Sequence, residues 1–221
     1  LPYHNMDTFY VRVVRSFDSP LQLFFDSEVL MYCHMPLHAV FLTIVELITG
    51  ECTIINARIL SVLLGSLVPV LAYRFVWELK KNRAMAFLAG IFLMLSPTAI
   101  YWSRHASPYA LSLFLVFLTI NYYLRFLRYP KRGNMYLFMI CTISMMGTHL
   151  FAWWFAAGFA IHSLFQKALS LEEKKAVWGT VFLGGSLFAY IPMISSSYVD
   201  IAVTPQSELG SYPPITNYMW D

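Results

Sequence analysis

The chain has 221 residues, of which 58% are hydrophobic and only 12% are charged, with a formal net charge of +3. Soluble domains carry about a quarter charged residues, so this composition excludes an ordinary soluble domain and indicates an integral membrane protein. The sequence contains no GxGxxG, P-loop, HExxH or nucleophile-elbow motif, and its basic clusters are not nucleic-acid patches. Cys33, Cys52 and Cys141 lack CxxC spacing and indicate neither a disulfide framework nor a zinc module.

Residues 1–55 are predicted to form an extracytoplasmic loop with interfacial helices, because charged residues interrupt its apolar runs. Within it, residues 36–50 carry apolar side chains at helical spacing, with Pro36 in the first turn and Gly50 as a stop signal. This helix is too short to cross a bilayer and carries Glu46. We therefore expect it to lie along the membrane surface.

A transmembrane bundle of six helices is predicted over residues 56–197, because a spanning helix needs about 20 apolar residues and six stretches approach that length. These stretches are 59–79, 84–102, 109–127, 135–149, 151–165 and 177–195. The fourth and fifth are short and meet near Gly147 with almost no loop, which indicates a tight helical hairpin. Residues 198–221 are expected to begin another extracytoplasmic loop. The predicted fold class is an all-α polytopic membrane bundle, and we expect the chain to be a fragment of a larger polytopic protein.

The orientation follows from the distribution of basic residues, which favour the cytoplasmic side. Three connections that fall on one side of the six-helix bundle hold the clusters Lys80–Arg83, Arg125–Arg132 and Lys167–Lys175. The other side receives most of the acidic residues together with Arg104 and His149. A catalytic site is therefore expected on the extracytoplasmic side.

Arg104 is the one formal charge between Arg83 and Arg125, and long apolar runs flank it on both sides. A guanidinium does not lose its charge by deprotonation, so it must meet water or pair with an anion. The apolar runs can cross the membrane and the guanidinium can still meet water if Arg104 lies in a short loop between two spanning helices, at the aqueous surface. The two alternatives for its partner are a bound anionic substrate and a lipid headgroup.

Several short motifs occur in an order that resembles a known family. Asp7 is followed by His34-Met35-Pro36-Leu37, Arg58-Ile59-Leu60-Ser61, Leu95-Ser96-Pro97, Ser103-Arg104 with Tyr109-Ala110-Leu111, and Thr148-His149. From Asp7 to Phe151 the chain resembles membrane glycosyltransferases of the GT-C superfamily. It is most similar to bacterial and archaeal relatives of the dolichyl-phosphate-mannose–protein mannosyltransferases, which also resemble the aminoarabinose transferase of lipid A. The family's acidic pair is Asp7-Thr8 here, and the prolines of two motifs are missing.

The resemblance implies an inverting hexosyl- or pentosyltransferase that moves a sugar from a polyprenyl- or dolichyl-phosphate donor to an extracytoplasmic glycan, lipid or protein. In the family the matching first-loop aspartate is the general base, which makes Asp7 the candidate catalytic residue. Such a base takes the acceptor proton as the hydroxyl attacks the anomeric carbon. The alternatives for Asp7 are a solvated loop acid and a helix cap.

The resemblance also implies which residues face the donor phosphate. Arg104 would bind it with its planar fork, and His34 and Tyr109 would add contacts. His105 and His149 are candidate substrate contacts. The alternative for His149 is a histidine with a structural role at a helix end.

No cofactor is implied, and a divalent metal is the open alternative. His34 and His38 form an i, i+4 pair that could hold a metal on one helix face, with Asp26 or Glu28 completing the set. The competing interpretation is an ordinary polar face of an interfacial helix.

Two other classes of protein compete with the enzyme: a lipid or solute transporter and a scaffold that has lost the chemistry. A transporter places ionisable groups near the membrane midplane, whereas these spans carry few charges and polar groups gather at one end. The single carboxylate at Asp7-Thr8 keeps the scaffold as an alternative.

Overall fold

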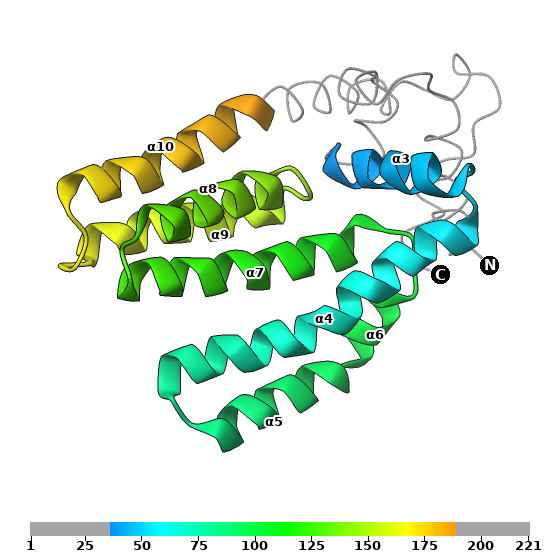
Figure 1. The fold of residues 1–221 in the computed structure, drawn as a ribbon, viewed down its shortest axis with the longest axis horizontal. Helices are drawn as coiled ribbons and strands as arrows, with labels where there is room; N and C mark the ends of the chain where they lie inside the picture. Colours follow the sequence, from blue (N-terminus) through cyan, green and yellow to red (C-terminus); the bar gives the residue numbers. More distant parts are fainter. Residues whose placement is uncertain (1–35, 189–221) are drawn as a thin grey trace, which may run out of the picture.

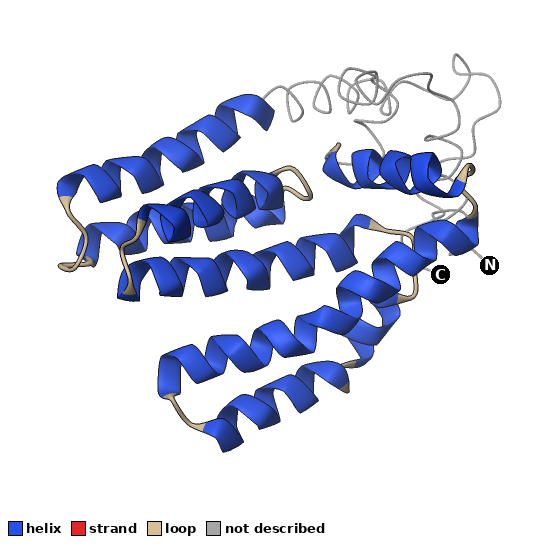
Figure 2. Cartoon of the chain, in the orientation of Figure 1, coloured by secondary structure: helices blue, strands red, loops and turns tan. Residues whose placement is uncertain are grey.

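The computed structural model describes residues 36–188, and over this range the chain forms eight helices and no strand (Figure 2). The helices are α3 (Leu37–Thr49), α4 (Ile54–Lys80), α5 (Arg83–Met94), α6 (Pro97–Ser103), α7 (Pro108–Arg128), α8 (Arg132–Met146), α9 (Phe151–Phe165) and α10 (Leu171–Phe188). The prediction of an all-α helical membrane bundle is confirmed. The division into residues 1–55, 56–197 and 198–221 stays a prediction, since both outer parts extend beyond the described residues.

Local signals account for where several helices begin and end. Helix α3 ends where Gly50 adopts φ 79°, a left-handed conformation that costs glycine little, as its stop signal predicted. The Thr53 side chain accepts a hydrogen bond from the Asn56 backbone N–H at the start of α4. Asn82 caps α5 in the same way by accepting from the N–H of Met85.

Two helices, α4 and α7, are individually long and apolar enough to cross a membrane. Taken together as one bent segment, α5 and α6 are also long and apolar enough to cross a membrane. The described residues thus contain up to three candidate spans. Helix α9 is apolar but has only 15 residues, and α8 has the same length. The six-span arrangement therefore stays a prediction.

Residues 84–102, predicted as one spanning stretch, form two helices, α5 and α6, with a bend between them. The chain breaks after Met94, and the axes of α5 and α6 differ by 58°. The cause lies in the sequence Ser96-Pro97, because proline lacks an N–H and favours the first turn of a helix. Ser96 caps the new helix by accepting from the Ala99 N–H, and Pro97 begins it. The break redirects the chain before it reaches Arg104.

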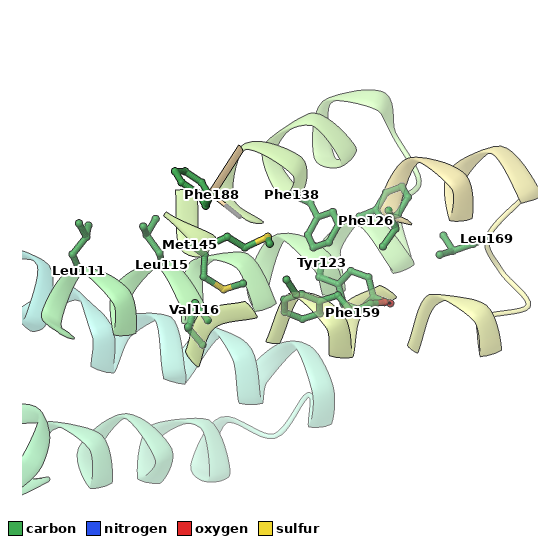
Figure 3. Close-up of a cluster of buried hydrophobic side chains, with 14 residues drawn as sticks. Leu111, Leu115, Val116, Tyr123, Phe126, Phe138, Met145, Phe159, Leu169 and Phe188 are labelled. Atoms are coloured by element: carbon green, nitrogen blue, oxygen red, sulfur yellow. The ribbon is translucent and has the colours of Figure 1, made fainter. Parts of the chain in front are cut away.

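The main hydrophobic core lies among α7, α8, α9 and α10 (Figure 3). Tyr123 of α7 contacts the rings of Phe138 on α8 and Phe159 on α9, with centroids 5.1 and 4.9 Å apart. Outside this core, large apolar side chains face outward, as with Phe92, which is 82% exposed. An apolar exterior around a packed interior is what a lipid environment favours.

Helix α4 joins this core through a polar contact and then pairs with α5. The Asn121 amide of α7 donates to the Leu71 carbonyl of α4 at 3.0 Å, and it also donates to the carbonyl of Phe117 within its own helix. Close backbone approach needs small residues, and Gly90 of α5 faces the Pro69 carbonyl, which a Cβ would meet at 3.2 Å. These contacts set the position of α5 and thus of the α6 segment that follows it.

The connections separate into two groups at opposite ends of the bundle (Figure 1). The turns after α4, α7 and α9, which carry the basic clusters, lie at one end. There Arg128 donates to the side chain and the carbonyl of Glu78, and Lys81 lies 2.8 Å from the same carboxylate. At the other end, α3, the α6–α7 loop and the α8–α9 turn come together. The sequence-predicted site residues within the described range are all at this second end.

Candidate functional site

Arg104 follows the last residue of α6 and begins the four-residue loop that leads to α7. Its backbone N–H donates to the Tyr101 carbonyl, which closes the last turn of α6. Its side chain is exposed, and none of the ion pairs found among residues 36–188 involves it. The placement of Arg104 in a loop between two helices is as expected, and its charge is available to an anion.

The last two residues of the loop are buried, and His105 is half-buried. Ala106 and Ser107 are 0% and 1% exposed, and Pro108 begins α7 at a position where its missing N–H costs nothing. The loop therefore presents Arg104 outward from a packed base. Because α7 begins directly after the loop, the positive end of its helix dipole adds to the potential at this point.

Helix α3 packs against the same loop through His38. His38 is only 1% exposed, although histidine at a membrane surface normally keeps its polar edge in water. Burial lowers the pKa of His38 from 6.5 to about 4, while hydrogen bonding with the Ala106 backbone acts in the opposite direction. The ring is therefore neutral at pH 7 and is linked to the loop 68 residues away in sequence.

A ladder of aromatic rings connects the α6–α7 loop to the α8–α9 turn. Its members in order are His105, Tyr101, Trp102, Tyr109, His149 and Phe151. Successive ring centroids lie 4.1 to 5.3 Å apart, so each ring packs against the next. The rings of Tyr109 and His149, separated by 40 residues in sequence, are neighbours at 5.3 Å. The structure thus brings Arg104, His105, Tyr109 and His149 into one cluster.

The two ladder histidines have defined proton positions when neutral. His105 Nδ1 lies 2.8 Å from the Tyr101 carbonyl and must donate to it, which leaves Nε2 as an acceptor. The Phe151 backbone N–H donates to Nδ1 of His149 at 3.1 Å, so the ring proton of His149 is at Nε2. His149 is 8% exposed and lies in the turn between α8 and α9, where the sequence predicted a tight hairpin.

Four of the sequence-predicted residues, Asp7, Asp26, Glu28 and His34, lie outside the described residues. Of the proposed metal set only His38 can be placed, and within residues 36–188 it does not belong to any group of three metal-binding side chains. The contact of His38 with the Arg104 loop was missed from the sequence. The sequence signal for it was helical spacing, which places His38 one turn before Leu42, on the face of α3 that is buried.

An open apolar groove with a volume of about 440 Å³ lies elsewhere, along α4, α5 and α7. Its lining includes Ala72, Phe92 and Phe117 and contains no member of the Arg104 cluster. The cluster is therefore a surface at the end of the bundle, formed by loops and helix termini.

Comparison with known proteins adds an independent finding. The sequence model of the family described as dolichyl-phosphate-mannose-protein mannosyltransferase matches residues 5–196. This range includes Asp7, His34, Arg104, Tyr109 and His149. No curated protein and no solved structure matches the chain.

Proposed function

The chain belongs to the dolichyl-phosphate-mannose-protein mannosyltransferase family, and from this premise we propose that it transfers a sugar from a polyprenyl- or dolichyl-phosphate donor to an extracytoplasmic acceptor, with inversion. Membership makes it a membrane glycosyltransferase that uses a lipid-linked sugar donor. The acceptor is a protein by the family description, and a glycan or lipid acceptor is the alternative.

One observation supports the proposal most directly: the exposed Arg104 side chain projects from a buried loop and belongs to none of the ion pairs among residues 36–188. In sugar transfer from a lipid phosphate, the leaving group is a phosphate that gains negative charge as its bond to the sugar breaks. A fixed guanidinium beside that oxygen stabilises the developing charge, and the N-terminus of α7 adds to it. Arg104 is therefore the proposed phosphate-binding residue.

The proposed general base is Asp7, which lies outside the described residues. The acceptor hydroxyl oxygen forms a bond to the anomeric carbon, and the bond from that carbon to the phosphate oxygen breaks. Asp7 takes the hydroxyl proton during this displacement, and the lipid phosphate departs beside Arg104. Attack on the face opposite the leaving group inverts the configuration at the sugar.

The aromatic cluster has supporting roles in this proposal. Tyr109 and His34 would contact the donor phosphate, and His105 and His149 would contact the sugar or the acceptor. In the neutral rings, Nε2 of His149 is a donor and Nε2 of His105 is an acceptor. His149 can therefore donate to a hydroxyl oxygen, and His105 can accept from a hydroxyl O–H.

The test is sugar transfer from radiolabelled lipid-linked donor by the full-length protein in membranes, with the Arg104→Lys variant. Lysine keeps the charge but loses the planar fork, so the donor KM should rise about 10- to 100-fold while the protein still inserts. Arg125→Lys is the matched control, since Arg125 is exposed in the last turn of α7 and this end of α7 lies at the opposite end of the bundle. Unchanged transfer by Arg104→Lys would refute phosphate recognition by this residue.

A scaffold that has lost the chemistry is the second candidate, because Thr8 stands where the family has a second carboxylate. Asp7→Asn separates the two in the same assay. Loss of a general base lowers turnover by about 10²- to 10⁴-fold and leaves donor binding intact. A scaffold would show no transfer in the unmodified protein and no difference in the variant.

A further inference from the structure

We propose that His38 of α3 is a positioning residue of the donor site, which holds the α6–α7 loop in the conformation that presents Arg104 to the donor phosphate. This inference rests on the proposed role of Arg104. It adds a residue from α3, which ends 55 positions before the loop begins, and it gives this helix a part in donor recognition.

The first support is the depth of the contact between His38 and the loop. Both His38 and Ala106 are essentially inaccessible, at 1% and 0% exposure, and the ring interacts with the Ala106 backbone. Ala106 is two residues from Arg104, so a shift of the loop at Ala106 moves the base from which the guanidinium extends. A buried polar contact of this kind favours one loop position, because any other would leave polar groups without equivalent partners.

The charge state of His38 separates its role from that of a phosphate ligand. Burial holds its pKa near 4, so the ring is neutral at physiological pH and cannot offer a positive charge to the donor. Its buried ring is also out of reach of a ligand bound at the surface. His38 therefore acts on the donor through the loop.

The second support is a second anchor on the same helix. The N–H of Leu37, next to His38, donates to the Gly147 carbonyl at 3.1 Å. Gly147 belongs to the α8–α9 turn, where an added Cβ would lie 2.8 Å from the Phe188 ring and 3.4 Å from Leu37. The first turn of α3 thus contacts the Arg104 loop and the His149 turn together, and the Tyr109–His149 ring contact joins those two segments directly.

A third contact fixes the loop from the side of α4. Gly65 approaches Ser103 so closely that a Cβ there would lie 2.5 Å from the Ser103 Cβ. The residue before Arg104 is held by α4, and the residue two positions after it is held by α3. Ser103 and Ala106 are thus held on either side of Arg104. The direction of the Arg104 side chain then depends on where α3 lies, because His38 of α3 contacts Ala106.

The experiment is a double-mutant cycle on the full-length protein in membranes, with His38→Leu, Arg104→Lys and the double variant. Leucine fills much of the ring volume but removes the polar contact. We expect His38→Leu to raise the donor KM and the inhibition constant of sugar-free polyprenyl phosphate by about 3- to 10-fold, with the acceptor KM unchanged. His38→Asn, which restores a donor and an acceptor, should recover part of the donor affinity. Leu47→Ala, at an exposed position of the same helix, is the control and should change neither constant.

The cycle distinguishes this inference from the proposed function. If His38 acts through Arg104, the double variant should bind donor no worse than Arg104→Lys alone. If the two fold-changes multiply, or if His38→Leu and His38→Asn change the donor and acceptor KM values equally, His38 has a merely structural role and the inference is overturned. If Arg104→Lys by itself leaves the donor KM unchanged, the proposed function of Arg104 fails and this inference fails with it.

Discussion

Replacing Gly65 by alanine should test how closely α4 approaches α6 beside Arg104. The added Cβ would lie 2.5 Å from the Cβ and 3.3 Å from the Cα of Ser103. Non-bonded carbon atoms are normally about 3.5–4.0 Å apart, so the two helices must separate by about 1 Å. Neither atom of Ser103 can rotate away, because one is backbone and the other is attached directly to it. Overpacking of this kind costs about 1–3 kcal/mol.

The consequence should reach the site as well as the stability, because Arg104 follows Ser103 directly. We expect the thermal midpoint of the purified full-length protein to fall by about 2 to 10 °C in Gly65→Ala. The donor KM should rise in the same variant. Gly158→Ala is the matched control, since an added Cβ at this α9 position meets no atom within 4 Å. That substitution should stabilise the protein by about 0.5–1 kcal/mol through helix propensity.

A second-site variant makes the steric argument refutable. Ser103→Gly removes the Cβ that Gly65→Ala would strike, and the double variant should regain most of the lost stability and donor affinity. A Gly65→Ala protein that is as stable as the unmodified protein would refute the steric contact between α4 and Ser103. The contact is also refuted if Ser103→Gly adds a further loss and restores nothing.

Two further predictions concern pH and topology. Burial lowers the pKa of His38 from 6.5 to about 4, so the unfolded chain binds a proton in this range that the folded protein excludes. The free energy of unfolding should therefore decrease by up to about 3 kcal/mol as the pH falls from 6.5 to 4. His38→Asn should lack this decrease, which thermal denaturation of both proteins at pH 7 and pH 5 would measure. Equal pH dependence of the two proteins would contradict the prediction. In a variant without native cysteines, a cysteine at Leu150 should react with a membrane-impermeant thiol reagent from the extracytoplasmic side, and one at Gly133 should not. Equal labelling of both would overturn the proposed orientation.

Much of the fold was predictable because its signals are local. The helix ending at Gly50, the loop around Arg104 and the hairpin turn at Gly147 all follow from apolar length, glycine conformation and the cost of burying charge. The stretch over residues 84–102 was predicted as one spanning segment, and its division into two helices also has a local cause. Its apolar composition outweighed the Ser96-Pro97 start signal, although that signal was present in the sequence.

The arrangement of the candidate site was only partly predictable. Topology alone brings Arg104, Tyr109 and His149 to one end of a helical bundle, since alternate connections share an end. It does not determine that the Tyr109 and His149 rings are neighbours, which depends on how far α7 and α8 rotate about their axes when they pack. Whether Asp7 and His34 join this cluster stays a prediction.

The sequence by itself determined the class of protein, most of the helices and the end of the bundle where polar residues collect, because each depends on composition or on neighbours along the chain. Tertiary structure decided which distant residues meet. His38 looked like one half of a metal pair with His34, yet packing buries it against Ala106. The physical reason is that burial and contact between distant segments depend on how closely helix surfaces pack, as at Gly65 and Ser103. Such packing leaves no periodic pattern in the sequence from which it could be predicted.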